Sequence, residues 1–594
     1  MAITLGQWTL GLHGGEAPGR ELIGGKASSI ARMQALGLDV PPAFVVTTRA
    51  CAACLADGAP PAGLDDELVA GVAWLERQTG RCFGAGARPL LVSVRSGAPV
   101  SMPGMMDTVL NLGINDATEA ALAAECGDGK FARDTNRRFL DLYAHIVLKT
   151  GEIALDPGGD PASWRAAIAA LGAPVPEDAA EQLRCAVRAV FESWNSRRAR
   201  RYRQHHGISD DLGTAVTVQA MVFGNLDDRS GTGVLFSRNP LTGEPAPYGE
   251  YLARAQGEDV VSGRFTPKPL AALAADLPEV HAHLIAGAQK LERAGRDAQD
   301  IEFTIERGRL YFLQSRAAKL APHAAARIAV DLVHEGLIDE ATALQRVTPD
   351  QVRLLLAPRL PEGAASAAKL LASGEGASPG VGIGVVVGDS EEAERRAHAG
   401  EAVVLARATT SPEDLHGMIA ARAVITEQGG STSHAAVVGR ALGLPCVVGC
   451  GAGALAALVG ATVTVDGRAG KVFDGALPIE APSEKDYASL ATLAGWAAAR
   501  APLRVVAPSA ACAREAVDLG ADVAAADPAG VAVALAARKG ARGARGGAIA
   551  SDEGVRAAIA AGLEFIVADP ILPPLLAAAR LAAEAPNAQR KEMR

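Results

Sequence analysis

Apolar residues occur along this chain in two patterns, short runs of strand length and longer stretches with helical spacing. The runs at 90–94, 215–223, 423–426 and 446–448 are rich in Val, Ile and Leu and have the length of buried strands. They alternate with helical stretches throughout the chain. This alternation predicts a multidomain protein built from α/β and α+β units.

The helical stretches and the glycine-rich segments suggest how the chain is organised. Residues 115–210 and 317–370 have mainly helical periodicity. An Ala-, Pro- and Gly-rich stretch from 357 to 376 is typical of a linker, and a strand–turn–strand pattern near 465–473 closes the unit that follows. The Gly-x-Gly-x-Gly at 380–384 leads directly into an apolar strand without a helix, which excludes a dinucleotide-binding loop.

Residues 300–316 have the pattern of a hairpin that turns at Arg307–Gly308. Period-two alternation puts polar side chains on one face of each strand: Asp300, Glu302 and Thr304 on the first, Gln314 and Arg316 on the second. Carboxylates, an amide and a guanidinium on one surface suit Mg²⁺ and nucleotide phosphate. Spacing alone equally allows an exposed hairpin with a polar outer face.

Residues 423–449 predict a strand, a two-glycine turn, a helix that opens at Thr432–Ser433, and a second strand. Gly443 and Pro445 mark the end of that helix. His434 therefore lies in the first helical turn, where free backbone N–H groups favour an anion. A neutral imidazole there can attack a phosphoryl group, although a histidine that only caps a helix fits the same short pattern.

Two cations precede these motifs. Lys26 follows a glycine turn and could reach a phosphate, although the segment is not a Walker A loop and a solvated lysine fits it as well. Arg95 ends the strand at 90–94. The most basic stretch, residues 197–206, allows either a binding site for a phosphorylated partner or a solvated helix face.

Composition narrows the functional class. The chain has 594 residues, which suggests about four domains at one per ~150 residues. A net charge of -9 argues against non-specific nucleic-acid binding. The first residues lack a secretory signal and no apolar run of ~18 residues predicts a membrane span. The eight scattered cysteines fit buried thiols, so we expect a cytoplasmic protein.

The segment Gly-Gly-Ser-Thr-Ser-His-Ala-Ala-Val-Val at 429–438, followed by Gly-Leu-Pro-Cys-Val-Val-Gly, resembles the phosphohistidine segment of the pyruvate, phosphate dikinase family of PEP-utilising enzymes. Further segments resemble that family's ATP-binding domain, an ATP-grasp fold, in the same order: 24–26, 92–97, 101–108, 236–244, 249–252, 255–261 and 312–316. The resemblance implies that His434 carries phosphate.

Matched motif by motif, the resemblance implies a set of site residues. His434, Thr432 and Arg316 would be catalytic. The residues implied to bind ATP and its phosphates are Lys26, Arg95, Glu250, Asp259, Asp300, Glu302, Gln314 and Arg316. Within this set, Glu302 and Gln314 would bind Mg²⁺. The chain departs from the family pattern at Arg254, at Ser431, and at 263–265, where Phe265 takes the position of an arginine.

The resemblance also predicts the domains. These are an ATP-grasp domain at 1–345 with a helical insertion at about 115–210, a linker at 346–376, a swivelling β/β/α phosphohistidine domain at 377–485, and a short α/β remnant of a TIM barrel at 500–594. The family's Gly-Ile-Gly-Leu-Cys-Arg-Thr-Glu motif is absent, and Ala550–Ser551 stand near the expected catalytic cysteine. We therefore expect pyruvate conversion within this chain to fail.

The leading hypothesis is an ATP-dependent phosphotransferase. ATP, together with phosphate, would phosphorylate His434 and release AMP and pyrophosphate. The phosphoryl group would pass to a small-molecule acceptor, pyruvate in the family, held on the tail or on a separate barrel subunit. The departures at 254, 265 and 431 motivate an alternative, a non-catalytic nucleotide-binding or regulatory relative. A third hypothesis is an ATP-grasp ligase that works through an acyl phosphate.

Overall fold

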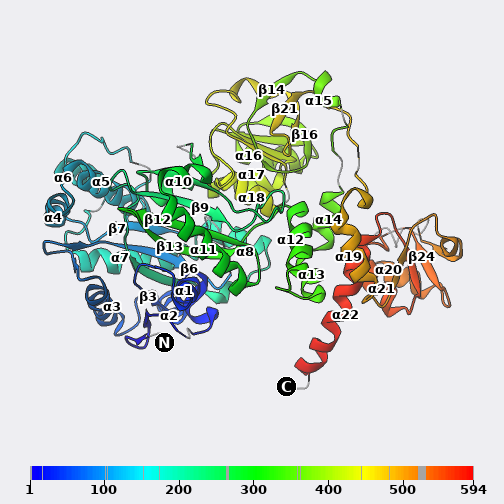
Figure 1. Cartoon of the computed structure of the whole chain (residues 1–594), viewed down its shortest axis with the longest axis horizontal. Helices are drawn as coiled ribbons and strands as arrows, with labels where there is room; N and C mark the ends of the chain where they lie inside the picture. The colour runs from blue at the N-terminus through cyan, green and yellow to red at the C-terminus, as the bar shows by residue number, and fades with distance from the viewer. Residues whose placement is uncertain are drawn as a thin grey trace.

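The computed structural model describes residues 3–592 apart from 16–17, 101, 103–104, 152, 173, 262–265, 357–358, 362, 443, 481, 520–529 and 547. An N-terminal unit holds two sheets, a histidine unit lies above it, and a C-terminal unit lies to one side (Figure 1). A layer of helices joins the three. In the described part of the chain, no helix is both long and apolar enough to cross a membrane.

The first sheet of the N-terminal unit is antiparallel, with strand order β1-β2-β3-β8-β6-β7. Its strands are β1 (Ile3–Thr4), β2 (Thr9–Leu12), β3 (Ala43–Val46), β6 (Val92–Gly97), β7 (Thr108–Leu112) and β8 (Ala215–Ala220). Three helices and a short strand pair accompany it: α1 (Arg20–Ala35), α2 (Thr48–Asp57), α3 (Leu64–Thr79), β4 (Cys82–Phe83) and β5 (Pro89–Leu90). Helix α1 is interrupted at Gly24, whose backbone is not helical, and after this break it buries Ala27, Ile30 and Ala31 at helical spacing, as a helix packed on a sheet requires.

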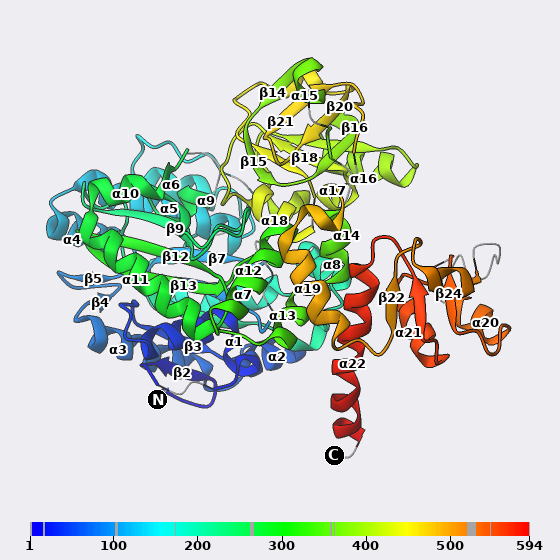
Figure 2. The same cartoon turned by 45° about the vertical axis from the view of Figure 1, so that its right-hand side comes forward.

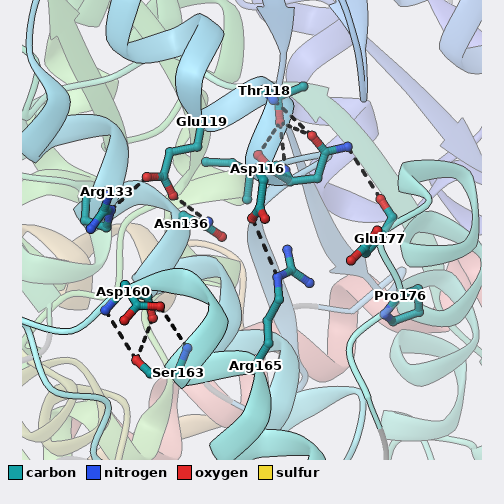
Figure 3. Close-up of polar contacts among 12 residues, drawn as sticks. Asp116, Thr118, Glu119, Arg133, Asn136, Asp160, Ser163, Arg165, Pro176 and Glu177 are labelled. Carbon is teal, nitrogen blue, oxygen red and sulfur yellow. Dashed lines mark hydrogen bonds and ion pairs between the residues drawn. The ribbon is translucent and has the colours of Figure 1, made fainter.

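The predicted helical stretch at 115–210 is confirmed. It contains α4 (Asp116–Cys126), α5 (Gly129–Ile146), α6 (Pro161–Ala169), α7 (Ala179–Ser193) and α8 (Arg197–His205), followed by the 3-10 turn η1 (Asp210–Leu212). Side chains cap these helices, for example Asp160, which accepts from the Ser163 N–H at the start of α6 (Figure 3). Glu119 joins α4 to α5 by accepting from Arg133 and Asn136 (Figure 3).

The second sheet is also antiparallel and has the order β11-β10-β9-β12-β13. It consists of β9 (Gly231–Phe236), β10 (Tyr248–Ala253), β11 (Lys268–Pro269), β12 (Gln299–Glu306) and β13 (Arg309–Ala317), with α9 (Gly257–Val261), α10 (Leu270–Asp276) and α11 (Pro278–Gly295). The hairpin predicted at 300–316 is confirmed as β12–β13. Its register pairs Asp300 with Arg316 and Glu302 with Gln314.

The histidine unit is built on an eight-stranded sheet with order β14-β21-β20-β16-β17-β18-β19-β15. Its strands are β14 (Leu370–Ser373), β15 (Glu375–Ser378), β16 (Val381–Val387), β17 (Val403–Arg407), β18 (Ala423–Thr426), β19 (Cys446–Val448), β20 (Thr462–Asp466) and β21 (Lys471–Asp474). Its helical segments are α15 (Ala364–Ala367), α16 (Ser390–His398), η2 (Pro412–Asp414), α17 (Leu415–Ala420), α18 (His434–Leu442) and η3 (Ala456–Leu458). The strands predicted at 423–426 and 446–448 are confirmed, whereas Gly443 lies outside the described residues.

The stretch predicted as a linker at 346–376 is more structured than expected. It contains two helices, α14 (Pro349–Leu355) and α15, then strand β14 and the start of β15. These two strands follow each other in the chain yet pair at opposite ends of the sheet order, β14 with β21 and β15 with β19. The pairing partners lie far along the chain, so local composition could not reveal them.

The helical layer consists of α12 (Pro322–His334), α13 (Glu340–Arg346), α14, the turn η4 (Glu484–Asp486) and α19 (Ala488–Ala498), against which the start of α22 (Leu572–Glu592) packs. The C-terminal unit has a parallel sheet of order β22-β25-β24-β23. Its elements are β22 (Arg504–Val506), η5 (Ala511–Glu515), β23 (Val517–Asp518), α20 (Val531–Ala536), β24 (Gly543–Arg545), α21 (Asp552–Ala560) and β25 (Phe565–Val567). Figure 2 shows this unit standing apart from the N-terminal unit.

Candidate active site

The N-terminal and histidine units enclose one large cavity of about 770 Å³. The face of the histidine unit that carries α17 and α18 is turned toward the N-terminal unit (Figures 1 and 2). Seven of the ten predicted catalytic and binding residues line this cavity: Lys26, Arg95, Glu302, Gln314, Arg316, Thr432 and His434. The structure therefore brings the predicted nucleotide-binding and phosphohistidine motifs into one space.

Glu302 and Gln314 lie opposite each other on β12 and β13. Arg95, on β6 of the first sheet, donates from Nη2 to Glu302 Oε2 at 3.0 Å and to Gln314 Oε1 at 3.2 Å. On the same hairpin, Arg316 Nε donates to Asp300 Oδ2 at 2.7 Å. The bonds of Arg95 connect the two sheets, and that of Arg316 lies within the hairpin; together they hold two guanidinium groups at the cavity.

The approach of α1 to β6 depends on Gly24. This residue has φ 73°, and a Cβ on it would lie 1.6 Å from the carbonyl oxygen of Gly97. Only glycine fits a position that combines this conformation with such close backbone contact. The next N–H, that of Gly25, donates to the carbonyl of Ala98 at 2.9 Å. The glycine pair thus places Lys26 at the cavity wall.

The charges around the cavity strongly perturb one another. Burial, together with the neighbouring charges of Arg95 and Arg316, lowers the pKa of Lys26 to about 7 against the opposing effect of Glu302. Burial acts to raise the pKa of Glu302, but Arg95, Arg316 and Lys26 outweigh it and keep that carboxyl's pKa below its ordinary value. Three cations around one ionised carboxylate make the cavity suited to a polyanion.

His434 is the first residue of α18 and lines the opposite wall of the cavity. Its Nδ1 lies 3.2 Å from the hydroxyl oxygen of Thr410. Its Nε2 is buried and has no hydrogen-bond partner among the residues that the structure describes. Burial lowers the pKa of His434 to about 4, with Asp414 opposing the shift, so the imidazole is neutral near pH 7.

Three of the predicted binding residues do not line the cavity. Asp300 lies behind it and pairs with Arg316. Asp259 accepts from Arg138 Nη1 at 2.9 Å and from the N–H of Gln256, which itself lines the cavity. Glu250 contacts the histidine loop instead of the cavity, because its carboxylate accepts from the hydroxyls of Ser431 and Thr432. Glu250 and Asp259, which the resemblance assigns to ATP binding, are therefore not part of the cavity wall in this structure, and their role in binding stays a prediction.

The sequence reasoning did not single out Thr410 as a site residue. Thr410 follows β17, which is parallel to β18, and the carboxyl ends of adjacent parallel strands meet at one edge of a sheet. The segment after β17 is therefore expected near the loop after β18, which leads to His434. The sequence offered the apolar run at 403–406 before Thr410, whereas its parallel pairing with β18 comes from the structure. The N-terminal unit also contacts the histidine unit through apolar side chains: Met102 and Met105 belong to the same buried cluster as Ala435 and Val438 of α18.

The basic stretch at 197–206 is not simply a solvated face. Arg198 ion-pairs with Asp107 and reaches Glu413 of the histidine unit at 3.0 Å. Arg203 is buried over the ring of Trp194. Of the departures from the family pattern, Arg254 pairs with Asp228 at the surface, and 263–265 lie outside the described residues.

The donor set of the cavity fits Mg²⁺. Among the described residues, no group of three or more His, Cys, Asp or Glu side chains converges as a metal site. Glu302 and Gln314 nevertheless present one carboxylate and one amide oxygen side by side, both within hydrogen-bond distance of the same nitrogen of Arg95. Mg²⁺ commonly takes only one or two protein oxygens and completes its shell with phosphate and water.

Comparison with known proteins adds an independent observation. A family model described as the AMP/ATP-binding domain of pyruvate phosphate dikinase matches residues 60–286, and one described as the mobile domain of PEP-utilising enzymes matches residues 399–470.

The chain is 41% identical to pyruvate, phosphate dikinase of Rhizobium meliloti over 571 residues, which are 87% of this chain and 63% of that relative. It is 41% identical to the Clostridium symbiosum protein of that name over 508 residues, which are 79% of this chain and 58% of the relative. It is 42% identical to pyruvate, phosphate dikinase 2 of Zea mays over 513 residues, 80% of this chain and 58% of that relative. The chain thus spans about three fifths of the length of these relatives.

Proposed function

The chain belongs to the pyruvate, phosphate dikinase family, and on that premise we propose that it is an ATP-dependent phosphotransferase that phosphorylates His434. One observation carries the proposal: His434 lines the same cavity as Lys26, Arg95 and Arg316. If those three cations hold the phosphates of ATP, the phosphorus atoms lie in the cavity that His434 also lines.

The neutral imidazole is the nucleophile in this proposal. In the tautomer in which Nδ1–H donates to Thr410, Nε2 carries the lone pair, and Nε2 is the nitrogen without a partner in the described structure. Thr410 would orient the ring and stabilise the cation that forms as the N–P bond forms. We expect the product to be phosphorylated on Nε2.

Atom accounting defines the products. AMP keeps the α-phosphate. If the β-phosphoryl group stays on Nε2, the γ-phosphoryl group must leave on inorganic phosphate as pyrophosphate. Lys26, Arg95 and Arg316 would neutralise the phosphate oxygens during these transfers. Glu302 and Gln314 would hold Mg²⁺, which when bound supplies further positive charge at the phosphates.

The finer architecture is part of the same proposal. Two antiparallel sheets that enclose a cavity, one of them with the β12–β13 hairpin, support an ATP-grasp assignment for residues 3–317. The parallel sheet β22-β25-β24-β23 with its helices supports a relation between the C-terminal unit and part of a β/α barrel. The named relatives motivate pyruvate as the first acceptor to test, with a separate barrel subunit as the alternative source of the acceptor site.

The test follows label from ATP to protein. With ATP labelled at the β-phosphate, together with phosphate and Mg²⁺, we expect acid-labile label on the wild-type chain and AMP in equal amount. His434→Ala should remove the label, whereas His398→Ala, which removes an exposed histidine of the same unit, should keep it. Absence of β-label on the wild-type chain would refute the proposal.

The same assay separates the rival functions. A regulatory relative would bind ATP without forming AMP, and a ligase would retain ATP turnover in His434→Ala. Adding pyruvate to the labelled chain, alone and then with a barrel-containing relative, asks where the acceptor site lies.

A further inference from the structure

A cluster of hydrogen bonds joins β10 of the N-terminal unit to the loop that precedes α18. The hydroxyl of Tyr248, on β10, lies 2.8 Å from the Ser431 Oγ and 2.8 Å from Oε1 of Glu375. Ser431 is fully buried, and its N–H donates to the other carboxylate oxygen of Glu375 at 3.2 Å. Tyr248 therefore contacts two parts of the histidine unit, its first strands and its catalytic loop.

Glu250 extends the cluster from the same strand. Its Oε1 accepts from the Ser431 hydroxyl at 3.1 Å and its Oε2 from the Thr432 hydroxyl at 2.5 Å. Gly430 makes this approach possible, because a Cβ there would lie 2.5 Å from Glu250 Oε1. Burial raises the pKa of Glu250 and Glu375 adds to the shift, while the hydroxyls of Thr432 and Ser431 oppose it.

Proton counting makes Ser431 the centre of the cluster. Its single hydroxyl hydrogen goes to Glu250, and its oxygen accepts from Tyr248, whose hydrogen is shared between Ser431 and Glu375. Replacing Ser431 by an apolar residue would leave a buried carboxylate oxygen and a phenol short of one partner each. Such losses cost more than the bond contributes, because the remaining groups stay desolvated.

We propose that Tyr248 and Ser431 are positioning residues for phosphorylation of His434. Their hydrogen bond spans the boundary between the two units and holds the loop three residues before the imidazole. The inference rests on the proposed function for its chemical meaning. The bond exists only while the histidine unit is docked, and both hydroxyls can return to water when the unit leaves.

A double-mutant cycle tests the inference. In single-turnover loading at saturating ATP, Tyr248→Phe and Ser431→Ala should each slow β-label transfer to His434 by roughly fivefold. The double variant should be slowed by less than the product of the two single effects, because both changes remove the same Tyr248–Ser431 bond. The KM for ATP should be unchanged, since neither residue lines the cavity. Tyr311→Phe and Ser373→Ala, which remove hydroxyls that make none of the contacts of this cluster, should load at the wild-type rate.

Hydrogen exchange of residues 427–437 without nucleotide gives a readout that does not need phosphotransfer. Tyr248→Phe and Ser431→Ala should each raise exchange in this segment, and the two control variants should not. The inference would be overturned if both site variants showed the wild-type loading rate and the wild-type hydrogen exchange. It would also be overturned if the slowing of loading in the double variant equalled the product of the two single effects. The two site variants could show the expected rise in hydrogen exchange while neither the wild-type chain nor any variant accepts label. In that case the Tyr248–Ser431 contact is supported as a docking contact and the proposed function is refuted.

Discussion

Burial sets the protonation of the two groups that face each other across the cavity, Lys26 and His434. The pKa of each residue is below its ordinary value, because the ammonium and the imidazolium both lose hydration when they are buried. The consequences differ. In the proposed function, Lys26 must be charged to hold a phosphate, whereas His434 must be neutral to attack one. The pH dependence of binding and that of loading therefore report different residues.

Nucleotide binding should take up protons. In the empty cleft the pKa of Lys26 is about 7, and the phosphates of ATP raise it, so above pH 7 binding requires protonation. The affinity for ATP should fall as pH rises above 7, by up to about tenfold per unit until the pKa of the complex is reached. Calorimetry in buffers of different ionisation enthalpy should show an uptake approaching one proton at pH 8. Lys26→Arg, which stays charged, should remove both effects, and an unchanged uptake in that variant would assign the proton to another group.

Loading of His434 should survive to lower pH than a free histidine allows. Before docking, the ordinary pKa of 6.5 applies, and in the docked state it is about 4. Because docking favours the neutral form, protonation weakens docking only as pH falls through this window, and the loss is complete near the lower value. The single-turnover rate should therefore have its acidic midpoint between 4 and 6.5. A midpoint at or above 6.5 would show that docking does not protect the imidazole.

Most of the candidate site is predictable from the sequence at this scale. Lys26, Arg95, Glu302 and His434 lie on recognisable strand ends, hairpins or glycine turns, and the structure brings them together. The contacts of Glu250 are not predictable in this way. Its partners, Ser431 and Thr432, are 181 and 182 positions away in sequence, and the bonds form only between docked units.

At the scale of elements, the position of α1 controls the cavity. Gly24→Ala places a methyl group against the Gly97 carbonyl at a positive φ, so α1 must move away from β6. We expect a loss of about 2–4 kcal/mol in unfolding free energy and weaker ATP binding, because Lys26 moves with the helix. Urea unfolding and ATP titration measure the two effects.

A matched control exists at the other end of the same helix. Gly37 has φ 71°, yet a Cβ there would meet no atom within 4 Å. Gly37→Ala should therefore cost only the conformational strain, about 1 kcal/mol, and leave ATP affinity unchanged. Equal effects of the two substitutions would show that strain, and not the contact with β6, makes Gly24 necessary.

Elements with local signals were the easiest to predict. The β12–β13 hairpin follows from period-two alternation around Arg307–Gly308, and β18 follows from a four-residue apolar run. Strands β14 and β15 have no such signal, because they are short and glycine-flanked and form by pairing with β21 and β19 about 70 to 100 residues later. Their existence is a property of the folded unit and not of their own sequence.

At the scale of the whole molecule, the cavity is complete only when the two units are docked. Thr410, Thr432 and His434 come from one unit, and the cations that suit phosphate come from the other. A ligand that contacts both walls must favour the docked arrangement, because it binds that arrangement better than the open one. In the proposed function, passing the phosphoryl group onward then requires the nucleotide products to leave and the histidine unit to move.

A non-hydrolysable ATP analogue with Mg²⁺ should therefore shift the chain toward the docked arrangement of the two units, without any phosphotransfer. We expect lower hydrogen exchange in residues 427–437 and a smaller radius of gyration by solution scattering. The free energy of unfolding should rise by about 2.7 kcal/mol at an analogue concentration 100 times its Kd. Lys26→Met should weaken every response in parallel, whereas His434→Ala should keep them, because the imidazole is the acceptor and not a binding group. If the analogue raises the melting temperature but leaves the exchange of 427–437 unchanged, the nucleotide binds the N-terminal unit alone and docking is driven by the contacts of Tyr248 and Glu250 instead.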